Sequence, residues 1–100
     1  MRFELEDFTY EVKFTRAGTT TYAILWKEVL HNTWDCTNIV GESHCNPKDR
    51  FEKGKGRKIA LAKLLKRMNE VSAGDSIPEF NLTKEIRQTI WTEYFKHHKV

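Results

Sequence analysis

The sequence predicts an α+β fold in which an N-terminal antiparallel β-meander of three to four strands precedes two helices packed on one face of the sheet. Apolar and polar residues alternate with period two through the first forty residues. After residue 46 the apolar spacing becomes helical, in two stretches separated by a loop that contains Gly74 and Pro78. We expect residues 1–100 to form a single domain, with the meander in 1–43 and the helices in 44–100.

The strands are predicted from residue type and from turn signals. Gly18 can adopt a positive φ and predicts a turn over residues 16–19, and residues 31–33 predict a second turn. Tyr22, Ile24 and Trp26 share one face of a strand rich in β-branched and aromatic residues. The expected strands are a short edge strand at Phe3 and Leu5, then residues 8–14, 20–30 and 34–40.

The first helix is expected from Pro47 to about Val71, because Asn46 is a good N-cap and proline is tolerated at the first helical position. Its apolar stripe consists of Leu61, Leu64, Leu65 and Met68, which Phe51 extends. Gly54 and Gly56 each weaken a helix by about 1 kcal/mol relative to alanine and therefore predict a break or kink.

The second helix is expected from an N-cap at Thr83 to about His98. Ile86, Ile90 and Tyr94 are predicted to face inward, with two further aromatic residues beside them. Residues 72–80 are expected to form the loop between the two helices.

Charge divides the chain sharply. Residues 1–43 hold four Lys/Arg and seven Asp/Glu, a net −3, whereas residues 44–100 hold thirteen and seven, a net +6. Nine basic residues fall within the twenty positions 48–67, opposed only by Asp49 and Glu52. Such density is typical of phosphate-contacting surfaces, although a solvated helix face is an equal alternative. The candidate binding residues are Lys48, Arg50, Lys53, Lys55, Arg57, Lys58, Lys63, Lys66 and Arg67.

Arg57 and Lys58 are the first candidates within this set. They follow Gly56, where a backbone without Cβ lets a partner approach closely, and the sequence suggests no structural role for them.

The same segment carries a motif of ten residues at fixed spacing, C-x-P-x-D-x-F-x-K-x-x-G-R-K-x-A-L. The motif resembles one shared by many small phage and prophage proteins, and the resemblance covers about residues 44–97. It implies a phage origin and the cytoplasm of an infected bacterial host, where inhibitors of bacterial defence, anti-CRISPR proteins among them, act. Its residues here are Cys45, Pro47, Asp49, Phe51, Lys53, Gly56, Arg57, Lys58, Ala60 and Leu61.

Other chemistries are less favoured. Cys36, His44 and Cys45 could join another histidine at zinc, but eight residues separate the cysteines, which fits no standard zinc spacing, and two buried thiols are the better prediction. A Cys45 nucleophile lacks an orienting group. The acidic residues Glu4, Glu6, Asp7 and Glu11 predict a surface strand. Trp26, Trp34 and Trp91 are expected in the core.

We therefore expect no catalytic residues, no metal and no cofactor. The leading hypothesis is a non-enzymatic inhibitor that binds a bacterial defence protein or nucleoprotein complex and acts by steric occlusion. The alternatives are an accessory protein that binds DNA or RNA through residues 48–67, and a scaffold that associates through an apolar helix stripe. No apolar run approaches the roughly 18 residues of a membrane span, so we expect no membrane association. The oligomeric state is left open.

Overall fold

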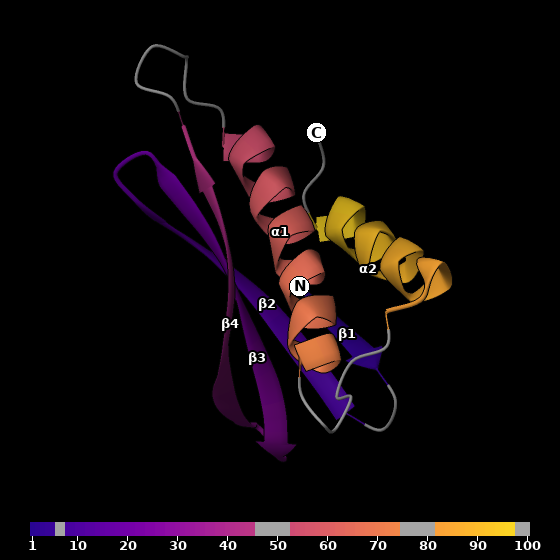
Figure 1. The fold of residues 1–100 in the computed structure, drawn as a ribbon. Helices are drawn as coiled ribbons and strands as arrows, with labels where there is room; N and C mark the ends of the chain where they lie inside the picture. Colours follow the sequence, from indigo (N-terminus) through magenta and orange to yellow (C-terminus); the bar gives the residue numbers. More distant parts are fainter. Residues whose placement is uncertain (6–7, 46–52, 75–81, 98–100) are drawn as a thin grey trace.

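The computed structural model describes residues 1–5, 8–45, 53–74 and 82–97 (Figure 1). A four-stranded antiparallel sheet in the order β1-β2-β3-β4 is followed by two helices on one face of the sheet. This arrangement confirms the predicted α+β fold with its N-terminal meander. The elements are β1 (Arg2–Leu5), β2 (Phe8–Ala17), β3 (Thr20–Leu30), β4 (Thr33–His44), α1 (Lys53–Gly74) and α2 (Lys84–His97).

The two tight turns of the meander lie where the sequence predicts them. Gly18 has φ 61° between β2 and β3, and Asn32 has φ 60° between β3 and β4. Asparagine tolerates this left-handed conformation better than most residues that carry a Cβ. The strands around the turns are longer than expected, because β2 continues to Ala17 and β4 begins at Thr33.

Strand β4 is the least regular of the four. It extends to His44, beyond the predicted end at Val40. It also contains a β-bulge: between the pairs Ile24–Val40 and Trp26–Cys36, β3 advances by two residues while β4 advances by four. Thr37 stabilises the bulge: its hydroxyl donates to the Leu25 carbonyl at 2.8 Å and accepts from the Ile39 N–H at 3.2 Å. These bonds satisfy backbone groups that the interrupted ladder leaves without a strand partner.

Helix α1 runs from Lys53 to Gly74 with no break at Gly54 or Gly56, so the predicted break is wrong. The first helical residues proposed from Asn46 and Pro47 lie outside the described residues. Gly56 is buried against the sheet, and a Cβ built there would lie 2.7 Å from Thr21 Oγ1. Tertiary packing therefore outweighs the weak helix propensity of this glycine. The helix also takes in residues 72–74, which we expected in the loop.

Helix α2 begins after Thr83, whose hydroxyl accepts the Ile86 N–H at 3.2 Å, and this contact confirms the predicted N-cap. Ile90 and Tyr94 are fully buried and Ile86 is half-buried, as the periodicity predicts. The core joins this face to the α1 stripe and to the inward residues of the strands. Its largest buried side chains are Tyr94, Leu25, Leu61, Leu64, Met68, Ile90 and Val12.

The face of the sheet opposite the helices carries two of the tryptophans, so the expectation that they are core residues is wrong. Trp26 and Trp34 are half-buried there, because the inward face of β3 belongs to Thr21, Ala23 and Leu25. Cationic side chains lie over both rings, with Lys13 Nζ 4.8 Å from the Trp26 centroid and Arg2 Cζ 5.0 Å from that of Trp34.

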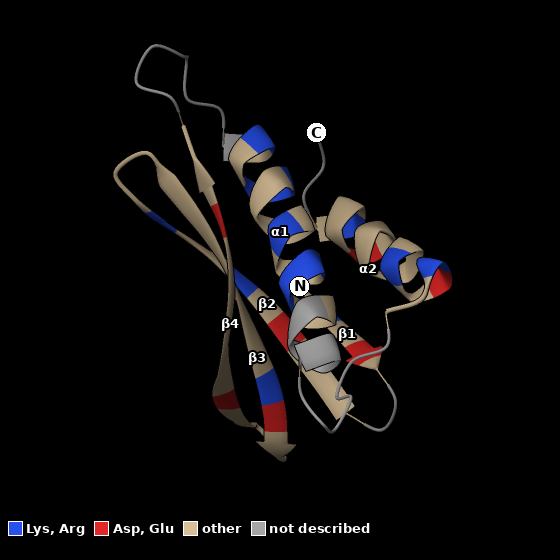
Figure 2. Ribbon diagram, in the orientation of Figure 1, with Lys and Arg blue, Asp and Glu red and all other residues tan. Residues whose placement is uncertain are grey.

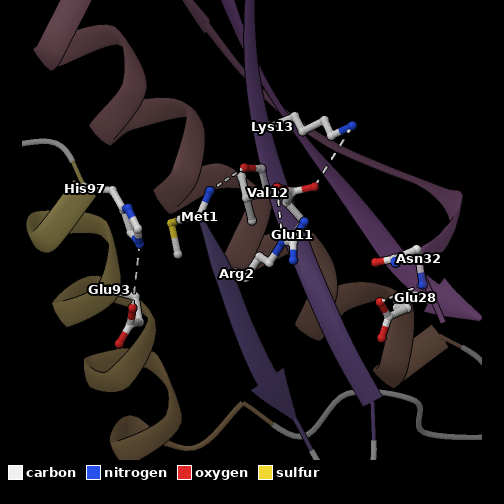
Figure 3. Close-up of polar contacts among 9 residues, drawn as sticks. All are labelled: Met1, Arg2, Glu11, Val12, Lys13, Glu28, Asn32, Glu93 and His97. Carbon is white, nitrogen blue, oxygen red and sulfur yellow. Dashed lines mark hydrogen bonds and ion pairs between the residues drawn. The ribbon is translucent and has the colours of Figure 1, made fainter.

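The Met1 amino group ties β1 to β2. It donates to the Val12 carbonyl at 3.1 Å, while Val12 N–H donates to the Met1 carbonyl at 2.9 Å (Figure 3). Burial lowers the pKa of this amine below its ordinary value of 8.0; Glu11 opposes the shift and Arg2 adds to it. None of the described helices combines the length and apolarity needed to cross a bilayer.

Candidate functional site: a basic groove at the sheet edge

The predicted basic segment lies mainly on α1, where Lys and Arg recur along successive turns (Figure 2). The acidic residues coloured in the figure lie on the strands and on α2. Lys48 and Arg50 lie outside the described residues, and Lys53 is helical with a side chain that is not described. The remaining six candidates occupy three different environments. Lys55 is exposed on its own, Arg57 and Lys58 are half-buried, and Lys63, Lys66 and Arg67 are exposed together.

Arg57 is half-buried. It precedes Leu61 by four positions and Leu64 by seven, which places it on the apolar stripe of the helix. Its Nε atom is buried and has no hydrogen-bond partner among the described residues. A guanidinium in this position packs with its aliphatic stem against the interior, so Arg57 has a structural role that the sequence did not suggest.

Lys58 faces the second helix. Its Nζ lies 5.5 Å from the Phe95 ring centroid, within the range of a cation–π contact. Phe95 is 48% exposed, so this cation–π contact lies at the surface of the protein. The structure thus gives both residues of the preferred pair contacts within the protein, and neither projects freely from α1.

Lys63, Lys66 and Arg67 form one wall of a groove of about 380 Å³ along the edge strand β4. Their spacing, i, i+3 and i+4, keeps them on a single face of α1. We call this feature the edge groove. It is lined by Val40, Glu42, His44, Lys63, Lys66 and Arg67.

Hydrogen bonds fix the β4 wall of the edge groove. His44 Nε2 lies 3.2 Å from Glu42 Oε2, and His44 Nδ1 lies 2.9 Å from Thr20 Oγ1. An ionised carboxylate only accepts, so Nε2 carries a proton, and in the neutral ring Nδ1 accepts the Thr20 hydroxyl. The Glu42 carboxylate therefore accepts a hydrogen bond from His44 on the same strand.

The electrostatic balance of the edge groove is positive. Three permanent cations face one carboxylate, and none of the three forms an ion pair within the described part of the chain. All three are exposed, so each ammonium or guanidinium is accessible to an incoming anion, and none has to leave an ion pair with a described residue. The arrangement suits an anionic partner held at a surface, with orientation set by the strand wall.

The alternative sites weighed from the sequence gain little from the structure. Cys36 is an exposed thiol, which corrects the prediction that it is buried, and Cys45 is half-buried. Among the residues described, no three His, Cys, Asp or Glu side chains gather as a metal site would require. Glu11 pairs with Arg2 at 3.5 Å and with Lys13 at 4.0 Å on the uncovered sheet face (Figure 3).

Sequence reasoning did not assign Val40, Glu42 and His44 to the site. They alternate along β4 with Ile39, Gly41 and Ser43, which are all buried. The missing information was tertiary: only the docking of α1 on β4 brings Lys63, Lys66 and Arg67 to these residues. The i, i+4, i+7 position of Arg57 relative to Leu61 and Leu64 was the available signal for its inward orientation.

Comparisons with known proteins add no relative on which this site could be placed. The chain matches no family model, no curated protein and no solved structure.

Proposed function

We propose that this chain is a non-enzymatic binding protein that inhibits a bacterial defence nucleoprotein complex by steric occlusion, with the edge groove as its contact surface. The observation that carries the proposal is the convergence of Lys63, Lys66 and Arg67 on one groove beside β4, the edge strand of the described sheet. Nucleoprotein complexes present anionic surfaces, both as phosphate and as acidic protein, which such a groove complements.

Occlusion requires only a rigid body and a complementary patch. Helix α1 is packed on β4 closely enough that Gly41 leaves no room for a Cβ, so the two walls of the edge groove keep a fixed separation. A preformed groove loses little conformational entropy when it binds, which favours affinity from a modest contact area. The resemblance of the motif over residues 45–61 to one in small phage proteins is a further reason for proposing an inhibitory role.

Phage plating on bacteria that carry a defined nucleic-acid-guided nuclease tests the proposal. We expect expression of the wild-type chain to restore plating and a Lys63→Glu/Arg67→Glu variant to lose this protection. Lys55→Glu is the matched control, since Lys55 is exposed on the same helix but outside the edge groove. Equal protection by both variants would refute the edge groove as the contact surface, and absence of protection by wild-type protein would refute the role in that system.

An accessory protein that binds nucleic acid directly is the second candidate, favoured by the exposed ammonium and guanidinium groups of the same three residues. Three neutralised phosphates predict a slope of about −2.7 for log K against log salt on duplex DNA. Titration at two salt concentrations measures this slope. A steep slope that Lys63→Glu/Arg67→Glu abolishes would favour this candidate over the inhibitor.

A further inference from the structure

Among the described strands β4 forms one edge of the sheet, and this edge runs along the edge groove. Cys45 N–H donates to the Thr19 carbonyl at 3.0 Å, and Thr20 lies opposite His44 in the antiparallel register. Hydrogen-bonded and non-hydrogen-bonded pairs alternate along an antiparallel ladder. Because Thr19 and Cys45 form a hydrogen-bonded pair, the next pair, Thr20 and His44, is non-hydrogen-bonded.

The same alternation continues along β4 as far as the bulge. On β4, Ser43 and Gly41 form hydrogen-bonded pairs with Thr21 and Ala23 of β3. The N–H and C=O groups of Val40, Glu42 and His44 therefore point away from β3. These three residues are the ones that form the strand wall of the edge groove. Within the described ranges no backbone group bonds to them on that side.

The cations of α1 lie alongside this open edge. Same-side residues of an antiparallel strand are about 6.8 Å apart, and the four-residue step from Lys63 to Arg67 rises about 6 Å. Helix α1 extends lengthwise beside β4 (Figure 1). An added strand would therefore place every second side chain against the α1 cations, where carboxylates complement them, and the others beside Val40.

We propose that the edge groove takes up an extended acidic segment of a partner protein as a fifth strand on β4. The proposal rests on the proposed function, whose contact surface it specifies. Main-chain hydrogen bonds to Val40, Glu42 and His44 provide affinity and register, and alternating carboxylates at Lys63, Lys66 and Arg67 provide selectivity. A second copy of this chain fits poorly, because pairing β4 with β4 would bring two sets of three cations together.

The test uses the full chain and a synthetic peptide of about six residues, the usual strand length, with alternating glutamate and valine. Amide exchange followed by NMR is expected to show protection of the Val40, Glu42 and His44 N–H groups on binding. Two further peptides of the same sequence carry N-methyl groups either on the valines or on the glutamates, and each lacks the backbone donors along one edge of the strand. One of the two should bind at least tenfold more weakly than the unmethylated peptide. Binding that is indifferent to both methylations overturns strand addition.

Charge exchange provides the second readout. Lys63→Glu/Arg67→Glu should lose the glutamate–valine peptide and gain a lysine–valine peptide, whereas Lys55→Glu should keep the wild-type preference. Thermal melting by circular dichroism establishes that each variant is folded. Failure of the wild-type chain to bind the glutamate–valine peptide at millimolar concentration also overturns the inference.

The peptide and plating experiments separate the two proposals. If restored plating depends on Lys63 and Arg67 but the peptide does not bind, the inhibitory function stands and strand addition is refuted. Peptide binding without restored phage plating supports strand addition at the edge groove and refutes the inhibitory role in the system tested. If duplex DNA binds the wild-type chain through Lys63 and Arg67 and the glutamate–valine peptide does not bind, nucleic acid is the ligand of the cations and the inference is overturned.

Discussion

The α-carbon of Gly41 on β4 lies directly against the backbone of Ala60 on α1. A Cβ built on Gly41 would overlap the Ala60 carbonyl oxygen and the Leu64 N–H, and it would come within 2.9 Å of Leu64 Cα. Backbone atoms cannot move aside as the end of a side chain can, so this contact sets the distance between helix and sheet. It also fixes the separation of the two walls of the edge groove.

We expect Gly41→Ala to destabilise the protein by about 3 kcal/mol or more, because one methyl group must push α1 away from the sheet. Urea denaturation followed by tryptophan fluorescence measures the loss. Gly54→Ala is the matched control: a Cβ there meets nothing within 4 Å, and removing a helical glycine should stabilise by about 0.5–1 kcal/mol. Wild-type stability for Gly41→Ala would show that the helix can shift freely.

Gly56 and Thr21 form a second helix–sheet contact that a double-mutant cycle can isolate. A Cβ on Gly56 would lie 2.7 Å from Thr21 Oγ1 but an ordinary 3.5 Å from Thr21 Cβ. Gly56→Ala should therefore destabilise wild-type protein and be tolerated, or even stabilise, when Thr21→Ala has removed the hydroxyl. We expect a coupling free energy of about 1 kcal/mol from urea denaturation of the four proteins. Additive effects would mean that Thr21 rotates away without cost.

The Met1 amine predicts a pH dependence with a definite sign. Because burial lowers its folded-state pKa below 8.0, the unfolded chain binds more protons between the folded value and 8.0. The free energy of unfolding should therefore rise with pH across this window, and the cost of the buried charge is present in full below it. Comparing the chain with its N-acetylated form isolates the effect, since acetylation removes the titrating group. Identical pH slopes for the two forms would contradict the prediction.

Most of the architecture was predictable because local signals and burial agree. Tyr10 and Val12 alternate with polar neighbours on β2, Gly18 permits the first turn, and the Thr83 hydroxyl caps α2. The predicted break at Gly54 and Gly56 does not occur, and the reason is physical. Helix propensity is a local free energy of about 1 kcal/mol per glycine, and burial of the α1 stripe against the sheet outweighs it.

The candidate site was only partly predictable. Density of charge identified α1, but a run of basic residues does not specify which side chains share a surface. Arg57 and Lys58 acquire internal contacts, while Lys63 and Arg67 meet His44 only because α1 docks along β4. Contacts between segments twenty residues apart depend on the packing of helix on sheet, which single-sequence periodicity does not encode.

The division of the basic residues predicts opposite consequences for Arg57 and Arg67. Arg57→Ala should lower stability by about 1–2 kcal/mol through lost packing of its stem. Arg57→Met retains that stem and removes the buried, unpaired Nε donor, so it should leave stability unchanged or raise it. Arg67→Ala, at an exposed position, should change stability by less than about 0.5 kcal/mol while weakening binding at the edge groove. Urea denaturation gives the first quantity, and titration with the glutamate–valine peptide or duplex DNA gives the second. If Arg57→Met abolished binding at wild-type stability, Arg57 would belong to the contact surface. Its assignment to a purely structural role outside the edge groove would then be wrong.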